Sequence, residues 1–291
     1  MESDLIMKLS SIYEMIAHHY INRKKVTIPT DLAKSRKLMI LATGTSANEF
    51  WNNVDLYLDK YKQYDYLVMN RSIYKMKDQV MKIKPKYLAM CDSIYWGSTN
   101  VAVSQDLALD TYHRAKEVLE QIDWECYLVT TIQEKFDFHN DNVKIIRINS
   151  TKCEGDGELV YWLYKNNFAH PGIYNVAQLA IYFGITFLYK EIGLVGIDFD
   201  FIKNLYCDEN GMLYEYVEHQ YDKSKEDGIM EYYTPDNTGT IYGSVMSKYI
   251  LQTAETFVSF SKMSIYAKKN NCKIVNYSLK SLLDCYEKQK L

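Results

Sequence analysis

Residues 177–199 read AQLAIYFGITFLYKEIGLVGIDF, and this segment constrains the fold more than any other part of the chain. Apolar residues with helical spacing lead through a turn to a short apolar strand, Ile192–Val195, which stops at Gly-Ile-Asp-Phe. Ligands of open α/β sheets bind outside the carboxyl ends of the strands. Asp198 is therefore a candidate site residue because of its position alone.

The same alternation of helix and strand runs along most of the chain. Helices are predicted over 47–61, 73–82, 107–122, 171–189 and 242–269, with Pro171 as a first helical residue. Strands are predicted over 38–42, 66–70, 87–91, 126–130, 143–148, 192–195 and 273–277. Strands that alternate with helices predict an α/β fold, a Rossmann-like and mostly parallel sheet with helices on both faces.

Two segments depart from this alternation. Residues 1–36 are predicted as an N-terminal helical extension, with a helix over 3–22 and a basic connector over 23–36. The helix carries one apolar stripe, formed by Leu5, Leu9, Ile12, Ile16 and Tyr20. Residues 37–285 are predicted as the Rossmann-like domain, and its polar, tyrosine-rich part, about 200–242, as a lid or binding loop.

Composition excludes several classes of function. The net charge of −3 gives no basic field for nucleic acid. The six cysteines contain no CxxC pair, which argues against a zinc site and a redox motif. The 27 tyrosines suit a surface that binds sugars or nucleobases, although a codon bias toward Tyr, Lys, Ile and Asn is the simpler explanation.

The sequence also predicts where the protein resides. The start, MESDLIMKL, lacks the basic region of a signal peptide, and the apolar run near 173–189 is too polar to span a membrane. We therefore expect a reduced, cytoplasmic protein. Lysines crowd the C-terminal region, where they form either a solvated helix face or a peripheral contact with anionic lipid at the inner face of the membrane.

Polar residues that follow the predicted strands are the candidate binding residues. Thr43, Gly44 and Ser46 form a turn that could aim backbone N–H groups at a phosphate, although the turn is neither GxGxxG nor a Walker A loop. Asn70 and Asp92 end the next two strands and suit a base edge or ribose hydroxyls. The alternatives are a plain turn and local capping by Asn and Asp side chains.

Candidates for catalysis lie in or beside the predicted lid. Asp198 and Asp200 form a D-x-D pattern that could hold Mn²⁺ or Mg²⁺ on a nucleotide diphosphate, or Asp198 could accept hydrogen bonds from sugar or backbone. His219 lies among lid tyrosines and is a candidate general base, the alternative being a merely exposed side chain.

Three segments resemble a known superfamily. LMILATGTSANEF is similar to the opening strand and glycine turn of the bacterial lipooligosaccharide sialyltransferases. NVAQLAIYFGITFLYKEIGLVGIDF resembles their helix and strand ending in Gly-Ile-Asp-Phe, and also the flagellin motility-accessory-factor glycosyltransferases. YGSVMSKYILQTAETF with CKIVNYS looks more like the second group. The resemblance covers about residues 37–280 and is strongest over 175–199.

The resemblance implies a Rossmann-like glycosyltransferase with a mobile lid and a CMP-activated, sialic-acid-like donor. By position, it places the following residues at the donor: Thr43, Gly44, Asn70, Asp92, Asn175, Val176 and Asp198. Asp200 stands where the family has a phosphate-binding tyrosine, and Tyr206 could substitute for it. The family's histidine before the last long helix has no counterpart in Gly243–Ser247.

The expected function is an inverting transfer of a sugar from a CMP-activated donor to a surface glycan or related acceptor. His219 or Asp200 would take the acceptor proton, and a monophosphate donor needs no metal or other cofactor. A pterin or nucleotide diphosphokinase and a degenerate nucleotide-binding partner module are the alternatives. The oligomeric state is left open.

Overall fold

The computed structural model describes residues 37–98, 105–207, 209, 213–217, 229–233 and 245–291. Its centre is an eight-stranded sheet in the order β11-β10-β6-β1-β2-β3-β4-β5, and all neighbouring strands pair in parallel. The strands are β1 (Lys37–Leu41), β2 (Asp65–Met69), β3 (Tyr87–Ala89), β4 (Cys126–Thr130), β5 (Val143–Arg147), β6 (Glu191–Val195), β10 (Lys273–Asn276) and β11 (Glu287–Lys288). This confirms the predicted Rossmann-like α/β architecture.

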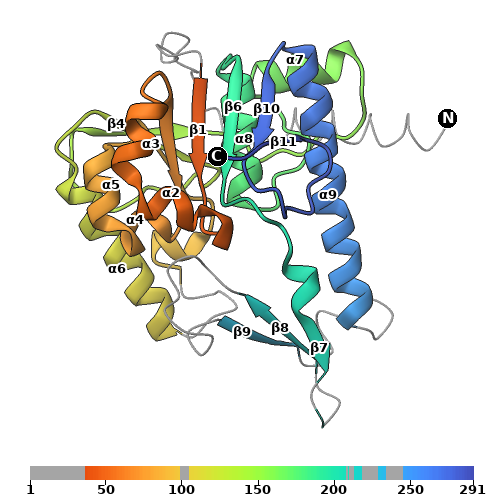
Figure 1. Ribbon diagram of the computed structural model, residues 1–291, viewed down its shortest axis with the longest axis horizontal. Coiled ribbons are helices and arrows are strands. Elements are labelled where there is room, and N and C mark those ends of the chain that lie inside the picture. The colour runs from red at the N-terminus through yellow and green to blue at the C-terminus, as the bar shows by residue number, and fades with distance from the viewer. Residues whose placement is uncertain (1–36, 99–104, 208, 210–212, 218–228, 234–244) are drawn as a thin grey trace.

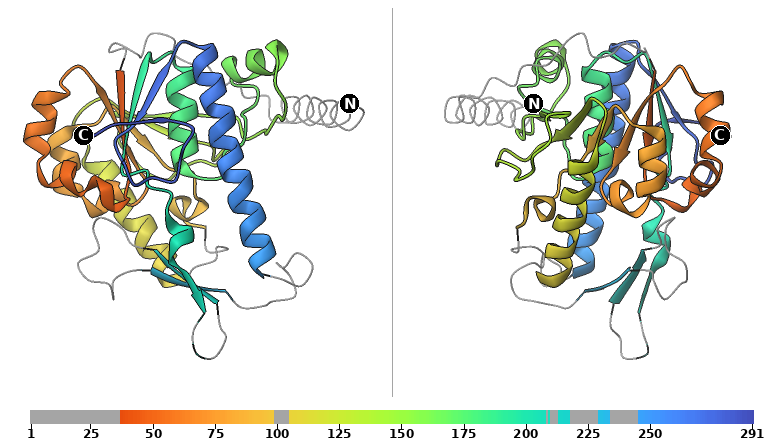
Figure 2. Two further views of the ribbon diagram at one scale, coloured as in Figure 1. Left: turned by 45° about the vertical axis from the view of Figure 1, so that its right-hand side comes forward. Right: turned by 90° about the vertical axis from the view of Figure 1, so that its left-hand side faces the viewer.

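Helices cover both faces of the sheet (Figures 1 and 2). The α-helices are α2 (Asn48–Asn52), α3 (Val54–Lys60), α4 (Ser72–Lys75), α5 (Lys77–Ile83), α6 (Gln105–Gln121), α7 (Glu158–Lys165), α8 (Val176–Thr186) and α9 (Val245–Lys269). Short 3-10 helices are η1 (Thr45–Ala47), η2 (Ser93–Trp96) and η3 (Phe201–Asn204). None of the described helices combines the length and apolar character that a bilayer span requires.

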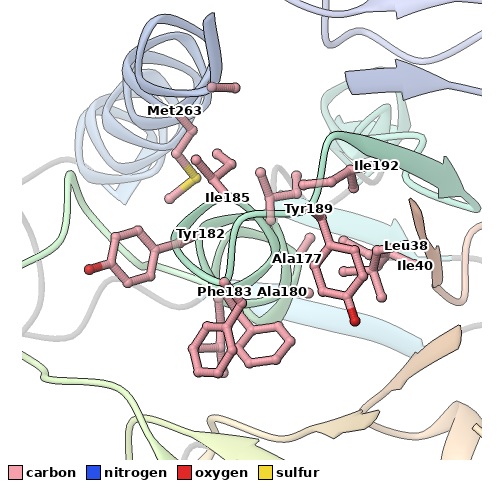
Figure 3. Close-up of a cluster of buried hydrophobic side chains, with 14 of the residues drawn as sticks. Leu38, Ile40, Ala177, Ala180, Tyr182, Phe183, Ile185, Tyr189, Ile192 and Met263 are labelled. Atoms are coloured by element: carbon pink, nitrogen blue, oxygen red, sulfur yellow. The ribbon is translucent and has the colours of Figure 1, made fainter. Parts of the chain in front are cut away.

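Successive residues of the central strands point to opposite faces, so β1 contributes to two cores. Leu38 and Ile40 join the core beneath α7, α8 and α9, whereas Met39 and Leu41 join the core beneath the helices of the other face. Figure 3 shows α8 between its neighbours, with Met263 of α9 on one side. Because α8 is buried on nearly every side, it is apolar around its whole circumference.

The strand order reverses between β1 and β6. The chain adds β2 to β5 on one side of β1, and then returns to place β6, β10 and β11 on the other side. Such a switch point is where open α/β sheets bind ligands, outside the carboxyl ends of the strands.

A second, antiparallel sheet lies beyond these carboxyl ends in Figure 1. It consists of β7 (Leu205–Cys207), β8 (Leu213–Val217) and β9 (Ile229–Tyr233), in that order. The described parts of the predicted lid are thus paired strands, with η3 before them. The rest of the lid and the predicted helix over 3–22 lie outside the described residues.

Several predicted helices have different bounds. The helix predicted over 47–61 is divided at Asn53, and the one over 73–82 is divided at Met76, since both residues leave the helical conformation. The helix predicted from Pro171 begins at Val176 because Asn175 is extended and caps it. Neither α7 nor β11 is expected from the sequence, because each is short.

Candidate functional site

The loops after β1 and β6 meet at the switch point and are bonded to each other. The Ala42 N–H donates to the Val195 carbonyl at 2.8 Å, and the Gly44 N–H donates to the Gly196 carbonyl at 2.9 Å. These bonds continue the ladder between β1 and β6 past the strand ends. The two loops therefore form one unit, although more than a hundred residues separate them in the sequence.

Asp198 joins the same two loops through its side chain. The carboxylate is buried and accepts hydrogen bonds from the Ser46 N–H at 3.0 Å and from the Ser46 hydroxyl. Charge-assisted bonds of this kind are stronger than neutral ones. The Ser46 N–H, one of the turn N–H groups predicted to face a phosphate, thus donates to a carboxylate of the chain itself.

Gly44 makes this close approach feasible. A Cβ atom on Gly44 would lie 2.5 Å from Asp198 Oδ2 and 2.5 Å from the Gly196 carbonyl oxygen. Both distances are well below contact distance, and the Gly196 atom belongs to the backbone. Protein atoms therefore fill the space beside Gly44. The close packing of the two loops explains why this position requires a glycine. Thr43, directly before Gly44, is half-buried.

Asn70 and Asp92 come together at the ends of β2 and β3, next to this unit. The Asn70 Nδ2 donates to Asp92 Oδ2 at 3.1 Å, and the Asn70 backbone is left-handed, with φ of +44°. Its Oδ1 is buried and has no hydrogen-bond partner among the described residues. A buried acceptor without a hydrogen-bond partner destabilises the folded protein unless another group supplies a donor.

Asp92 has an unusual electrostatic environment for a surface carboxylate. Its side chain is exposed, yet the surrounding protein desolvates it enough to raise its pKa. The hydrogen bond from Asn70 and the charge of Arg71 oppose that rise. A solvent-accessible carboxylate that is partly desolvated is typical of a binding or reacting group.

Asn175 lies at the same edge of the sheet as these loops. Gly184, near the other end of α8, packs against Ile192 and Leu38 close to the starts of β6 and β1, so α8 begins at the carboxyl ends of the strands. The Asn175 side chain accepts from the Gln178 N–H at 3.1 Å, as an N-cap does. Val176 is the first helical residue and is half-buried.

The remaining predicted residues follow the β6 loop in the sequence or lie outside the described residues. Asp200 lies 3.8 Å from Lys203 Nζ in an ion pair, and Tyr206 is an exposed residue of β7. His219 lies outside the described residues, so its assignment as a base stays a prediction.

Asp198 and Asp200 do not fit a divalent metal as they stand. Each Asp198 oxygen accepts a hydrogen bond from Ser46, and Asp200 is in an ion pair with Lys203, so both carboxylates already have partners in the chain. No group of three or more His, Cys, Asp or Glu side chains within the described ranges is arranged to hold a metal.

The C-terminal segment also holds these loops in place, which is not expected from the sequence. Asn276, which ends β10, donates from Nδ2 to the Ile197 carbonyl at 3.2 Å and accepts from the Ser278 N–H at 3.0 Å. The Leu282 N–H donates to the Asp198 carbonyl at 2.9 Å. Asn276 ends a strand just as Asn70 does, and that pattern is the signal that could have identified it.

These contacts define the candidate site: the bonded loops of β1 and β6, the Asn70–Asp92 pair beside them, and the start of α8. No family model matches the chain, and neither the curated proteins nor the solved structures contain a match to it.

Proposed function

We propose that this chain is a glycosyltransferase that uses a nucleotide-activated sugar, bound at the carboxyl ends of β6, β1, β2 and β3. The donor class is a sialic-acid-like sugar on CMP, and the acceptor is a surface glycan or a related molecule. The donor class follows from the sequence resemblance, and the location from the switch point.

The Asn70–Asp92 pair is the observation that carries this proposal. The Asn70 Oδ1 acceptor lacks a partner among the described residues, and the Asp92 carboxylate is exposed but partly desolvated. Cytosine offers an exocyclic amino donor, and ribose offers two hydroxyl donors. The pair supplies two acceptors that complement them, one on Asn70 and one on Asp92.

The reaction would proceed with inversion through an oxocarbenium-like state. Catalysis would require stabilisation of the departing phosphate and exclusion of water from the site. The start of α8 at Asn175 and the hydroxyl of Tyr206 are the groups proposed to face the phosphate, because the N–H groups of Gly44 and Ser46 are already bonded within the loops. His219 or Asp200 is proposed to take the acceptor proton.

One observation favours a second candidate, a nucleotide-binding module without catalytic activity. Asp198 is fully engaged by Ser46, and Asp200 is paired with Lys203, so neither is a free base. Such a module would bind the same nucleotide and act through a partner glycosyltransferase. A pterin or nucleotide diphosphokinase, the third candidate, would instead require ATP and Mg²⁺.

Thermal unfolding in the presence of CMP, CDP, UDP, GDP or ATP tests the proposal. Selective stabilisation by CMP or CDP is expected, because only a ligand that binds the folded state raises Tm. Stabilisation by ATP alone would contradict the proposal and favour the kinase. Hydrolysis of a CMP-sugar by the same protein would then separate the transferase from the inactive module.

A further inference from the structure

Helix α9 carries an apolar stripe on the face that points away from the protein core. Its inward face packs through Phe260, Met263 and Tyr266, which are almost completely buried. The outward face presents Leu251, Val258 and Ile265, and each of these side chains is about half exposed, at 49, 51 and 49 %. We call these three residues the α9 stripe.

The spacing of the α9 stripe is that of a helix-packing surface. Its members are seven residues apart, and the small residues Ala254 and Ser261, both exposed, stand between them. Small and apolar residues that alternate at three- and four-residue steps form the seam of paired helices. The described residues of this chain leave that seam open to solvent.

The N-terminal segment has a matching seam. Leu5, Leu9, Ile12 and Ile16 recur at steps of four, three and four residues. A helix over 3–22 would be about 30 Å long, and the α9 stripe extends for about 21 Å along its helix, both at 1.5 Å per residue. The two seams therefore match in period, and the segment is long enough to cover the stripe.

The point where the N-terminal segment joins the domain brings it close to α9. Lys37, the first residue of β1, and Lys273, the first of β10, are both in register with Glu191 of the intervening β6. The two strand starts are thus about 10 Å apart, at about 4.8 Å per strand. Helix α9 ends at Lys269, just before β10.

We propose that the N-terminal segment 3–22 of the same chain packs as a helix on the α9 stripe. The connector 23–36 reaches up to about 46 Å at ~3.3 Å per residue, which spans the stripe in either helix direction. A tether of this length holds the segment at an effective concentration near the millimolar range. A second copy of the chain has no such advantage.

Disulfide trapping in the full-length chain tests this proposal. Cysteines replace Ile12 and Val258, the central residues of the two seams, in a Cys207→Ser background that removes an exposed native thiol. Because each of these residues lies near the middle of its seam, the two come close together in both helix directions. In the matched control, cysteine replaces Ser10 and Ile12 is kept. Ser10 lies about 200° around the helix from Ile12 and therefore faces away from the seam.

We expect rapid oxidation of the Ile12–Val258 pair to an intramolecular disulfide at micromolar protein, at least fivefold faster than the control pair. Non-reducing electrophoresis and peptide mass spectrometry identify the product. Equal rates for the two pairs would overturn the proposal. A cross-linked dimer as the main product would also overturn it, because the occupant would then be a second copy.

Hydrogen exchange gives a second measurement that needs no new thiol. Leu9→Glu with Ile16→Glu should increase exchange in the peptide that covers 250–265, several-fold, because the stripe loses its cover. Ser10→Glu should leave that peptide unchanged. Unchanged exchange in the double variant would contradict the proposal even if the domain remains fully folded.

Discussion

Two neighbouring parts of the carboxyl edge satisfy their polar groups in opposite ways. At the β1–β6 switch point, the Ser46 hydroxyl and N–H both bond to Asp198, and the loop backbones bond to each other. At the ends of β2 and β3, Asn70 bonds Asp92 but leaves its Oδ1 without a partner among the described residues. In the first region the protein itself supplies the hydrogen-bond partners, whereas in the second region the Asn70 Oδ1 acceptor is left for a donor on a ligand.

Position at a switch point therefore does not make a residue a ligand-binding group unless its polar atoms still lack partners within the protein. The turn at 43–46 follows a strand of the sheet, as phosphate-binding loops do, but the protein supplies the anion from its own chain. The Asn70–Asp92 pair has a less distinctive sequence and a better capacity for binding. We therefore expect substitutions in the first region to alter stability and those in the second to alter affinity.

The largest effect is expected for Gly44→Val. The new side chain would collide with Asp198 and with the Gly196 carbonyl, so the two loops would have to separate. We expect a loss of about 3 kcal/mol or more in the free energy of unfolding, as for severe overpacking. Urea unfolding measures it, with Thr45→Val at an exposed neighbour as the control. Equal stability of the two variants would show that the loops do not depend on this contact.

The next largest effect is expected for His170, which precedes α8 and also has a hydrogen-bond partner within the protein. Its Nδ1 accepts from the Gly172 N–H at 3.1 Å, and burial lowers its pKa to about 4. Because the unfolded chain binds a proton below about pH 6.5 and the folded one does not, stability is complete above pH 6.5 and falls toward pH 4. The loss approaches about 3 kcal/mol, at 1.36 kcal/mol per pH unit.

Unfolding of wild type, His170→Gln and His139→Gln between pH 4 and 7 measures this dependence. The His170 variant should lose the slope, and the exposed His139 variant should keep it. A wild-type profile that is flat over this range would mean that His170 is readily protonated in the folded protein.

A smaller effect is expected for the bond between Ser46 and Asp198. Ser46→Ala removes one charge-assisted donor from a buried carboxylate, at a cost of about 1.5–3 kcal/mol. A double-mutant cycle with Asp198→Asn should show coupling, because the two residues are in contact. Additive changes in the free energy of unfolding would show that the Asp198 side chain does not hold the two loops together through Ser46.

The smallest change in stability, and the clearest change in affinity, is expected for Asn70→Gly. Glycine keeps the left-handed backbone without strain, so unfolding should change by less than about 1 kcal/mol. Loss of the amide should weaken CMP binding about tenfold, or ~1.4 kcal/mol. Asn271→Gly, at another left-handed and exposed position beyond α9, is the matched control for titration calorimetry. Equal affinities in the two variants would place the nucleotide elsewhere.

The sequence predicted the sheet well because buried parallel strands are short apolar runs that local pattern identifies. The runs at 38–42, 126–130 and 192–195 each appear as strands within about one residue of the prediction. The helices over 47–61 and 73–82 were predicted as single units because apolar periodicity does not report the breaks at Asn53 and Met76. Strands β7 to β9 are not expected from the sequence, because they lie in a polar, tyrosine-rich segment that lacks the apolar runs of the buried strands.

The amino-acid sequence is enough to predict the alternation of strands and helices, and with it the polar residues at the strand ends. Periodicity and apolar character are local properties, and the parallel sheet follows from them. Which of those polar residues are already bonded to one another depends on contacts between distant parts of the folded chain. Ser46 and Asp198 lie 152 positions apart, and no local pattern shows that they meet. Hydrogen-bond satisfaction depends on such contacts. A carboxylate that joins two loops, such as Asp198, can therefore be told from a pair that can bind a ligand, such as Asn70 and Asp92, only when the chain is folded.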